Sequence, residues 1–335
     1  MFQYFYHTRY TLRECGLAAL PGMTLRYFSA GLTQLLGHAR ASIYASVPKR
    51  DDVLVTEKAQ TGSIAVTIPT TPFDDAIKFD KTAVIIHIFY PELTAEIIEY
   101  VNNIPIKYGL FISTNSPEKA DAIQEVLQAM EVEALEVEVR VMPNRGRDIA
   151  PFYVGFRDVY ERYACFLHLH SKKSMHFTGQ GDSWRTHLFR QLLGDRVIAT
   201  NCLQILSSEN VGIVFPEHFG PIKGFIKWGE NFQLARSLLW RAGKTIDMNT
   251  RLDFPSGSMF WGRSQSIKKI LDFNFKFDDF PPEKGQCDGT LAHALERTLL
   301  FFVEAAGFEW VKTDLSGGLY SDKNCRSATL LKDQS

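Results

Sequence analysis

Residues 82–115 read TAVIIHIFYPELTAEIIEYVNNIPIKYGLFISTN, and this stretch decides the fold. The apolar run 82–90 predicts a buried strand, and 108–115 predicts a second one. Between them, residues 91–104 carry apolar side chains at helical spacing, with Pro91 placed at the helix start. A strand, a helix and a second strand in this order predict two parallel strands joined by a crossover helix.

The same alternation continues toward the carboxyl end. The next predicted elements are a helix at 116–130 capped by Ser116, a strand at 135–143, a helix at 148–163 and a strand at 164–170. We therefore expect an α/β fold with a mainly parallel sheet, helices on both of its faces and an N-terminal helical extension. In open sheets of this kind, ligands bind beyond the carboxyl ends of the strands.

The sequence changes character near residue 80, which suggests three parts. Residues 1–80 form an N-terminal extension and linker, 81–315 the α/β domain, and 316–335 a C-terminal tail. Within the extension, 25–47 has the pattern of an amphipathic helix that either docks on a membrane or partner, or packs on the domain. Residues 50–80 have the Thr, Gly and Pro content of a linker or an irregular edge.

Composition and missing motifs exclude several classes of protein. A net charge of -1 gives no overall attraction for nucleic acid. Five scattered cysteines, an odd number, favour reduced thiols in a cytosol, and neither a signal peptide nor a membrane span is predicted. The GQGD at 179–182 lacks the spacing and lysine of a phosphate-binding loop, no GxGxxG follows the first strand, and PSGSMF lacks the spacing of a nucleophile elbow. NAD-dependent oxidoreductases, kinases and serine hydrolases are therefore disfavoured.

Two of the predicted strands end in motifs suited to anions. The third is followed by Asn144, Arg145, Gly146, Arg147 and Asp148 in the turn before a helix, where backbone N–H groups and guanidiniums favour phosphate. Alternatively, Asp148 caps the helix and the arginines are only solvated. The fourth strand runs into a cluster of imidazole and ammonium groups in FLHLHSKKS, which concentrates positive potential at its carboxyl end.

Six ordered motifs together resemble the rhamnan synthesis protein F family of bacterial polysaccharide assembly. They are HIFYPEL, NRGRDIAPF, FLHLHSKKS, WRTHLFRQLLG, FPSGSMFWGR and PPEKGQCDGTLAHALER, and they run from about residue 82 to about residue 310. The resemblance implies a GT-A-like glycosyltransferase linked to rhamnose-containing O-chains, capsules or wall glycans. Residues 1–80 lie outside the resemblance.

The resemblance also implies a donor site for a nucleoside diphosphate sugar such as dTDP-rhamnose. Its expected donor-binding residues are His87, Asn144, Arg145, Gly146, Arg147, Asp148, His168, His170, Lys172, Lys173, Trp184 and Arg185. Common GT-A enzymes carry an aspartate pair that holds a divalent metal where this chain has His168 and His170. We therefore expect no cofactor, with imidazole and ammonium groups neutralising the diphosphate, and a divalent cation is the alternative. A further alternative is that both histidines only form hydrogen bonds near the sheet edge.

An inverting transfer also needs a base for the acceptor hydroxyl. The first candidate is Asp288, at the start of a late helix, and the second is Glu283. Asp288 could instead cap that helix, and His293 could pair with Glu296 inside the fold. The expected acceptor-side residues are Gly257, Met259, Trp261 and His293.

The predicted function is that of a glycosyltransferase, specifically an inverting rhamnosyltransferase, that extends a cell-surface polysaccharide. A non-catalytic glycan-binding or scaffold module is the alternative, since the aspartate pair is missing. Expected partners are the sugar nucleotide, a glycan or lipid-linked glycan acceptor and other polysaccharide assembly proteins, with no nucleic acid. The expected location is cytoplasmic, peripheral at the inner face of the membrane.

Overall fold

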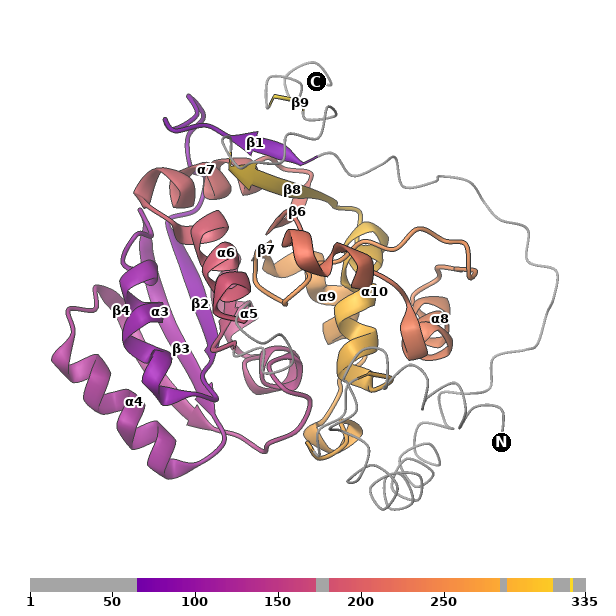
Figure 1. The fold of residues 1–335 in the computed structure, drawn as a ribbon, viewed down its shortest axis with the longest axis horizontal. Helices are drawn as coiled ribbons and strands as arrows, with labels where there is room; N and C mark the ends of the chain where they lie inside the picture. Colours follow the sequence, from indigo (N-terminus) through magenta and orange to yellow (C-terminus); the bar gives the residue numbers. More distant parts are fainter. Residues whose placement is uncertain (1–64, 173–180, 284–287, 316–325, 328–335) are drawn as a thin grey trace.

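A nine-stranded sheet forms the centre of the protein in a computed structural model that describes residues 65–172, 181–283, 288–315 and 326–327 (Figure 1). The strands are β1 (Val66–Ile68), β2 (Lys81–His87), β3 (Lys107–Thr114), β4 (Ala134–Val141), β5 (Cys165–His170), β6 (Val211–Pro216), β7 (Phe260–Arg263), β8 (Glu309–Leu315) and β9 (Arg326–Ser327). Their order is β4-β3-β2-β5-β7-β6-β8-β1-β9, and every pairing is parallel except those of β7 with β5 and β6. This is the expected mainly parallel α/β fold, and it is consistent with a GT-A-like architecture.

Helices cover both faces of the sheet, as predicted. They are α3 (Thr94–Val101), α4 (Pro117–Ala129), α5 (Val159–Arg162), α6 (Gly181–Leu193), α7 (Arg196–Leu206), α8 (Phe232–Arg241), α9 (Lys268–Leu271) and α10 (Leu291–Ala305). One core cluster contains apolar side chains of α3, α4, α6 and α7, and a second contains those of α5, α8, α9 and α10. Because both faces of β2, β5 and β6 are buried, these strands are continuous apolar runs in the sequence.

Local signals explain where the first helices begin. The 3₁₀ turn η3 (Pro91–Leu93) leads into α3. Pro91 suits the start of this turn, because an N–H at that position would have no partner within the helix. The Ser116 side chain accepts a hydrogen bond from the Lys119 N–H at 3.4 Å and so caps α4, as predicted.

Two segments of the structure differ from what their sequence pattern favours. Residues 148–163 contain the π-helical turn η4 (Pro151–Gly155) and the short helix α5 in place of one continuous helix. Of the motif FPSGSMFWGR, residues 254–263, only β7 is a strand, since Gly257 and Ser258 have φ of 91° and 53° and cannot be extended.

The edges of the sheet involve segments outside the predicted domain core. β1 lies within residues 50–80 and pairs in parallel with β8 and β9, so part of that segment is the second strand from an edge of the sheet. The predicted helix at 25–47 and most of the tail 316–335 lie outside the described residues, and the domain boundaries remain predictions. Within the described ranges, none of the helices combines the length and apolar character that a bilayer crossing requires.

Candidate functional site

The register of the sheet aligns three polar side chains at the carboxyl ends of adjacent strands. His87 of β2 pairs with Ser113 of β3 on one side and with His170 of β5 on the other. The His87 ring nitrogen Nδ1 lies 3.0 Å from the Ser113 hydroxyl. The parallel pairing therefore brings two predicted donor-binding histidines to one edge of the sheet, where ligands of such folds bind.

The NRGRD turn lies at this edge in a strained conformation. Gly146 and Arg147 have φ of 67° and 55°, and left-handed backbone is unfavourable for an arginine. A Cβ at Gly146 would lie 2.6 Å from both Ala150 Cβ and Phe280 Cδ1, so only glycine fits there. Strain of this kind is concentrated at functional sites.

The two arginines of the turn point to different partners. Arg145 donates to the Phe280 carbonyl at 2.7 Å and lies 3.8 Å from Asp278, so it fastens the turn to a distant loop. The Arg147 Nε lies 3.8 Å from a Glu283 oxygen, and this guanidinium is nearly half exposed. Burial raises the pKa of Glu283, opposed by Arg147 and by backbone N–H groups of the turn. The backbone amides predicted for phosphate therefore face the Glu283 carboxyl group, and the Asn144 carbonyl accepts from the Glu283 N–H.

Asp148 and His168 form a buried pair beneath the strand ends. The Asp148 Oδ2 and His168 Nε2 atoms are 3.9 Å apart, and the His168 ring lies against Phe152 with a centroid separation of 4.1 Å. Asp148 does not occupy the cap position of η4, which belongs to Ala150. Burial raises the pKa of Asp148 and lowers that of His168 well below its usual value, so both neutral forms are favoured.

The other two histidines are also neutral at pH 7. Burial lowers the pKa of His87 to about 4 and that of His170 to about 3, and the Lys172 ammonium adds to the effect on His170. Among the described residues of the free site, Lys172 and Arg147 therefore carry positive charge. Burial lowers the pKa of Lys172 as well, opposed mainly by the charges of Glu296 and Asp148. The imidazoles would share that charge only if a bound anion raised their pKa.

Lys172 lies over an aromatic platform. Its Nζ atom is 3.9 Å from the centre of the Trp184 ring. Arg185 donates to both Glu96 oxygens, at 3.2 and 3.1 Å, and to the Lys172 carbonyl at 3.0 Å, so it braces the backbone of the site. Lys173, predicted beside Lys172, lies outside the described residues.

The turn that precedes β7 closes the site from the other side. The His170 Nε2 donates to the Gly257 carbonyl at 2.7 Å, and the Ser258 hydroxyl donates to Glu296 Oε1 at 3.1 Å. Met259 and Trp261, predicted on the acceptor side, are instead fully buried in the core. Their side chains pack against helices across the sheet, where Trp261 donates to the Leu192 carbonyl, so they cannot contact an acceptor.

Asp288 neither caps α10 nor stands open to a ligand. Its carboxylate accepts from the Asn231 side chain at 2.5 Å and from the Glu230 N–H at 3.1 Å, at the turn η6 (Gly229–Asn231) before α8. The Arg297 guanidinium lies 3.4 Å away, and Gly289, with φ of 77°, turns the chain before α10. Asp288 therefore holds the turn η6 that leads into α8, and not the start of α10.

The predicted pairing of His293 with Glu296 is replaced by other contacts. His293 Nδ1 lies 2.7 Å from the Thr290 hydroxyl, whereas Glu296 accepts from Ser258. Burial lowers the pKa of His293 well below its usual value, and Arg147 and Arg297 add to this. The spacing of Glu296 three residues after His293 could have indicated that both reach the site from one helix.

Unsatisfied polar atoms concentrate in this region. Of seven buried side-chain nitrogen or oxygen atoms without a hydrogen bond in the described part of the chain, five belong to Asp148, His168, Trp184 and His293. A buried polar group without a partner costs about 1–3 kcal/mol. Such a concentration at the carboxyl ends of parallel strands makes this region the candidate ligand site.

The sequence did not predict a second polar network at the same edge. His218, which follows β6, lies 2.8 Å from the Ser256 hydroxyl and 2.9 Å from Asp253, and Lys312 lies 2.7 Å from Asp253. Although burial raises the pKa of Asp253, the His218 hydrogen bond and the Lys312 charge hold it well below its usual value. The network anchors the segment that carries Gly257. In the sequence, only Glu217, which ends VFPE at 214–217, indicates polar groups at the end of this strand.

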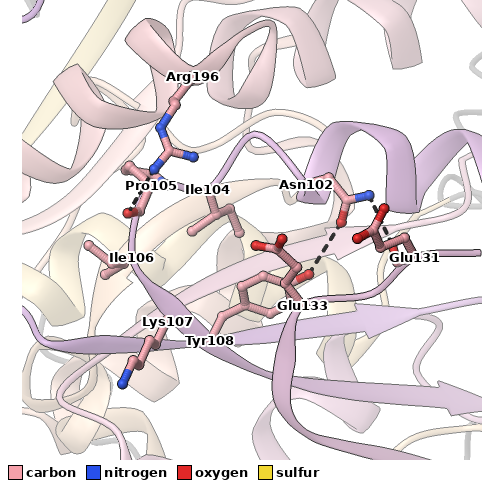
Figure 2. A pocket seen from close by; sticks show the side chains of 9 residues that line it. All are labelled: Asn102, Ile104, Pro105, Ile106, Lys107, Tyr108, Glu131, Glu133 and Arg196. Atoms are coloured by element: carbon pink, nitrogen blue, oxygen red, sulfur yellow. Dashed lines mark hydrogen bonds between the residues drawn. The ribbon is translucent and has the colours of Figure 1, made fainter.

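A surface hollow of about 440 Å³ lies at the opposite edge of the sheet, where β3 begins (Figure 2). Its lining residues are Asn102, Ile104, Pro105, Ile106, Lys107, Tyr108, Glu131, Glu133 and Arg196. Arg196 donates to the Pro105 carbonyl, and Tyr108 donates to Asn102. None of the predicted site residues lines this hollow.

No group of three or more His, Cys, Asp and Glu side chains within the described residues is arranged to hold a metal ion. His87 is bonded to Ser113, His170 to the Gly257 carbonyl, and His168 faces Phe152.

Fold and site together define a mainly parallel α/β protein with a cluster of histidine and cationic side chains at the carboxyl ends of its strands. The family model for rhamnan synthesis protein F matches residues 56–308, and the chain belongs to this family. The match begins well before residue 82, where the resemblance was expected to start, and so includes β1.

Two curated relatives come from two strains of Xanthomonas campestris pv. campestris. Each is described as the uncharacterized protein WxcX, and each is 32% identical to this chain over 229 residues. The aligned part is 68% of this chain and 32% of the relative, so the chain spans about a third of the length of these relatives. Membership of the family implies a role in the synthesis of rhamnan or related polysaccharide.

Proposed function

We propose that the chain is a glycosyltransferase that moves a deoxyhexose, in our proposal rhamnose, from a nucleoside diphosphate to a growing cell-surface glycan with inversion at the anomeric carbon. The family supports the role in polysaccharide synthesis. The site supports the chemistry, because departure of a nucleoside diphosphate creates negative charge that must be stabilised. Lys172 and Arg147 are the charged groups that would meet it.

The observation that carries this proposal is the combination of these two cations with unsatisfied buried atoms at one sheet edge. A diphosphate would take the charges, and sugar hydroxyls, which both donate and accept, would supply a partner for Asp148, whose side chain is 11% exposed. The Trp184 ring beneath Lys172 offers an apolar surface suited to a sugar or base. We propose that fixed cations make the reaction independent of metal, and a divalent cation remains the alternative.

A non-catalytic glycan-binding or scaffold module is the second candidate. Two predicted donor-binding arginines favour it, because they contact other protein groups. Arg145 donates to the Phe280 carbonyl, and Arg185 donates to Glu96 and to the Lys172 carbonyl. A binding module would need the hydrogen-bonding groups but not the charge of Lys172.

Turnover of sugar nucleotide by the purified full chain separates the two candidates. We expect release of nucleoside diphosphate from dTDP-rhamnose, dependent on a glycan acceptor and persisting in excess EDTA. Loss of activity in EDTA that manganese or magnesium restores would contradict metal independence. Glycan binding without any turnover of a panel of sugar nucleotides would favour the scaffold. The matched control for Lys172→Met is Lys268→Met, a change at an exposed lysine that pairs with Asp272.

We further propose that the acceptor is a glycan or lipid-linked glycan and that the protein works at the cytoplasmic face of the membrane with other polysaccharide assembly proteins. Deleting residues 1–45 tests the N-terminal segment in this role. If the truncated protein sediments with membranes as well as the full chain does, that segment is not what attaches it.

A further inference from the structure

We infer that Glu296 is the base that takes the proton from the acceptor hydroxyl, in the place predicted for Asp288. The inference rests on the proposed function and concerns the same site. It follows from comparing what already occupies the oxygens of the three carboxylates near the end of the domain, namely Glu283, Asp288 and Glu296.

Asp288 has both oxygens engaged. The Asn231 amide donates to Oδ1, the Glu230 N–H donates to Oδ2, and Arg297 lies beside Oδ1. Its side chain is 7% exposed. These donors occupy both oxygens, so an acceptor hydroxyl could reach neither one without displacing a buried donor.

Glu283 is engaged as well, although 22% of its side chain is exposed. Its carboxyl group faces the backbone N–H groups of Gly146 and Arg147 and the Arg147 guanidinium. These contacts hold the strained turn in place. A proton taken up by Glu283 would weaken that turn at the moment when the leaving group needs Arg147.

Glu296 has the same exposed fraction, 22%, but fewer partners. Oε1 accepts one hydrogen bond, from the Ser258 hydroxyl, and Oε2 lies 3.9 Å from Arg297, beyond hydrogen-bonding distance. Arg297 is already committed to the Lys227 and His293 carbonyls. Glu296 therefore keeps accepting capacity on an oriented carboxylate.

The surroundings place Glu296 within the site. Burial lowers the pKa of Lys172, and the charge of Glu296 is the leading influence that opposes it. The same charge opposes the lowering of the pKa of His170. Ser258, which orients the carboxylate, has φ of 53° and is buried, so the turn positions its hydroxyl rigidly.

The proposed step balances in atoms and electrons. The acceptor oxygen forms a bond to the anomeric carbon while the bond from that carbon to the diphosphate oxygen breaks. The bonding electron pair leaves with the diphosphate, beside Lys172 and Arg147, and the hydroxyl proton goes to Glu296 Oε2. Solvent later removes this proton and restores the carboxylate.

The test compares Glu296→Gln with Asp288→Asn and Glu283→Gln in the full chain, with Glu161→Gln as an exposed control. Glutamine keeps the size of Glu296 and can accept the Ser258 hydrogen bond, but it does not take a proton. We expect kcat for Glu296→Gln to fall roughly 100-fold to 10,000-fold, with the KM for the donor changed less than about threefold. Glu296→Asp should recover part of the loss, which a purely structural role would not produce.

For Asp288→Asn we expect a lower melting temperature and a smaller loss of kcat. The inference is overturned if folded Glu296→Gln keeps more than about a tenth of the parent kcat, or if Asp288→Asn loses more kcat than Glu296→Gln without melting earlier. Absence of transfer by the parent chain would instead overturn the proposed function. The two failures are therefore distinguishable in one set of assays.

Discussion

Replacing Gly257 by alanine tests whether the turn before β7 is as constrained as its geometry indicates. A Cβ at this position would lie 2.7 Å from Leu188 Cδ1 and 3.3 Å from Trp184 Cζ2, and the backbone has φ of 91°. The left-handed backbone costs about 1–2 kcal/mol for a residue with a Cβ. Crowding in a packed region adds about 1–3 kcal/mol, since Leu188 is buried and cannot swing away freely.

We therefore expect Gly257→Ala to lower the free energy of unfolding by about 2–5 kcal/mol, measured by urea denaturation. Gly243 supplies the matched control, because its φ is 82° and a Cβ at this position would have no atom within 4 Å. Gly243→Ala should lose only the backbone part, about 1–2 kcal/mol. Equal losses in the two variants would refute the crowding, and an unchanged Gly257→Ala would refute the strain as well. Because the Gly257 carbonyl accepts from His170, donor affinity should fall in Gly257→Ala and not in Gly243→Ala.

Three further predictions concern charge at the site. Lys172→Met and Arg147→Met should each weaken binding of the sugar nucleotide by about 1.5–3 kcal/mol in calorimetry, and a folded variant with parental affinity would place that residue outside the site. The pKa of His87 is about 4 and that of His170 about 3, both below the ordinary 6.5, so their neutral forms stabilise the fold above pH 6.5. Denaturation at several pH values should show this stability declining as the pH falls from 6.5 toward 3, whereas a flat profile would contradict the burial of these rings. Binding of the sugar nucleotide should take up protons at pH 6, because a bound diphosphate raises the pKa of both His87 and His170. Calorimetry in two buffers of different ionisation enthalpy would detect this uptake. Equal heats in the two buffers would argue against contact between the diphosphate and these rings.

Much of the fold could be predicted because each central strand is buried on both faces and is therefore a continuous apolar run. The residue pattern also predicted that His87 and His170 lie at one edge of the sheet, since parallel strands share a direction. Such reasoning works where one element determines its own environment.

The roles of individual side chains could not be predicted, because their partners come from distant segments. Arg145 contacts Phe280, and Asp288 contacts Asn231, across long stretches of sequence. Trp261 is buried because β7 runs between β5 and β6, which no local pattern indicates. Neither the protonation of the histidines nor the accepting capacity of Glu296 can be read from spacing, because both depend on burial and on neighbouring charges.

The pairing of β1 with β8 has a consequence for synthesis on the ribosome. Val66 pairs with Thr313, so the first strand of the sheet to be made acquires its neighbour only when the last part of the domain has emerged. By contrast, β2, β3 and β4 are joined by single crossover helices and can assemble early. Vectorial folding should therefore begin with β2, β3 and β4 and finish at β1. Ribosome-bound chains halted before β8 should show amide protection in β2, β3 and β4 and none in β1.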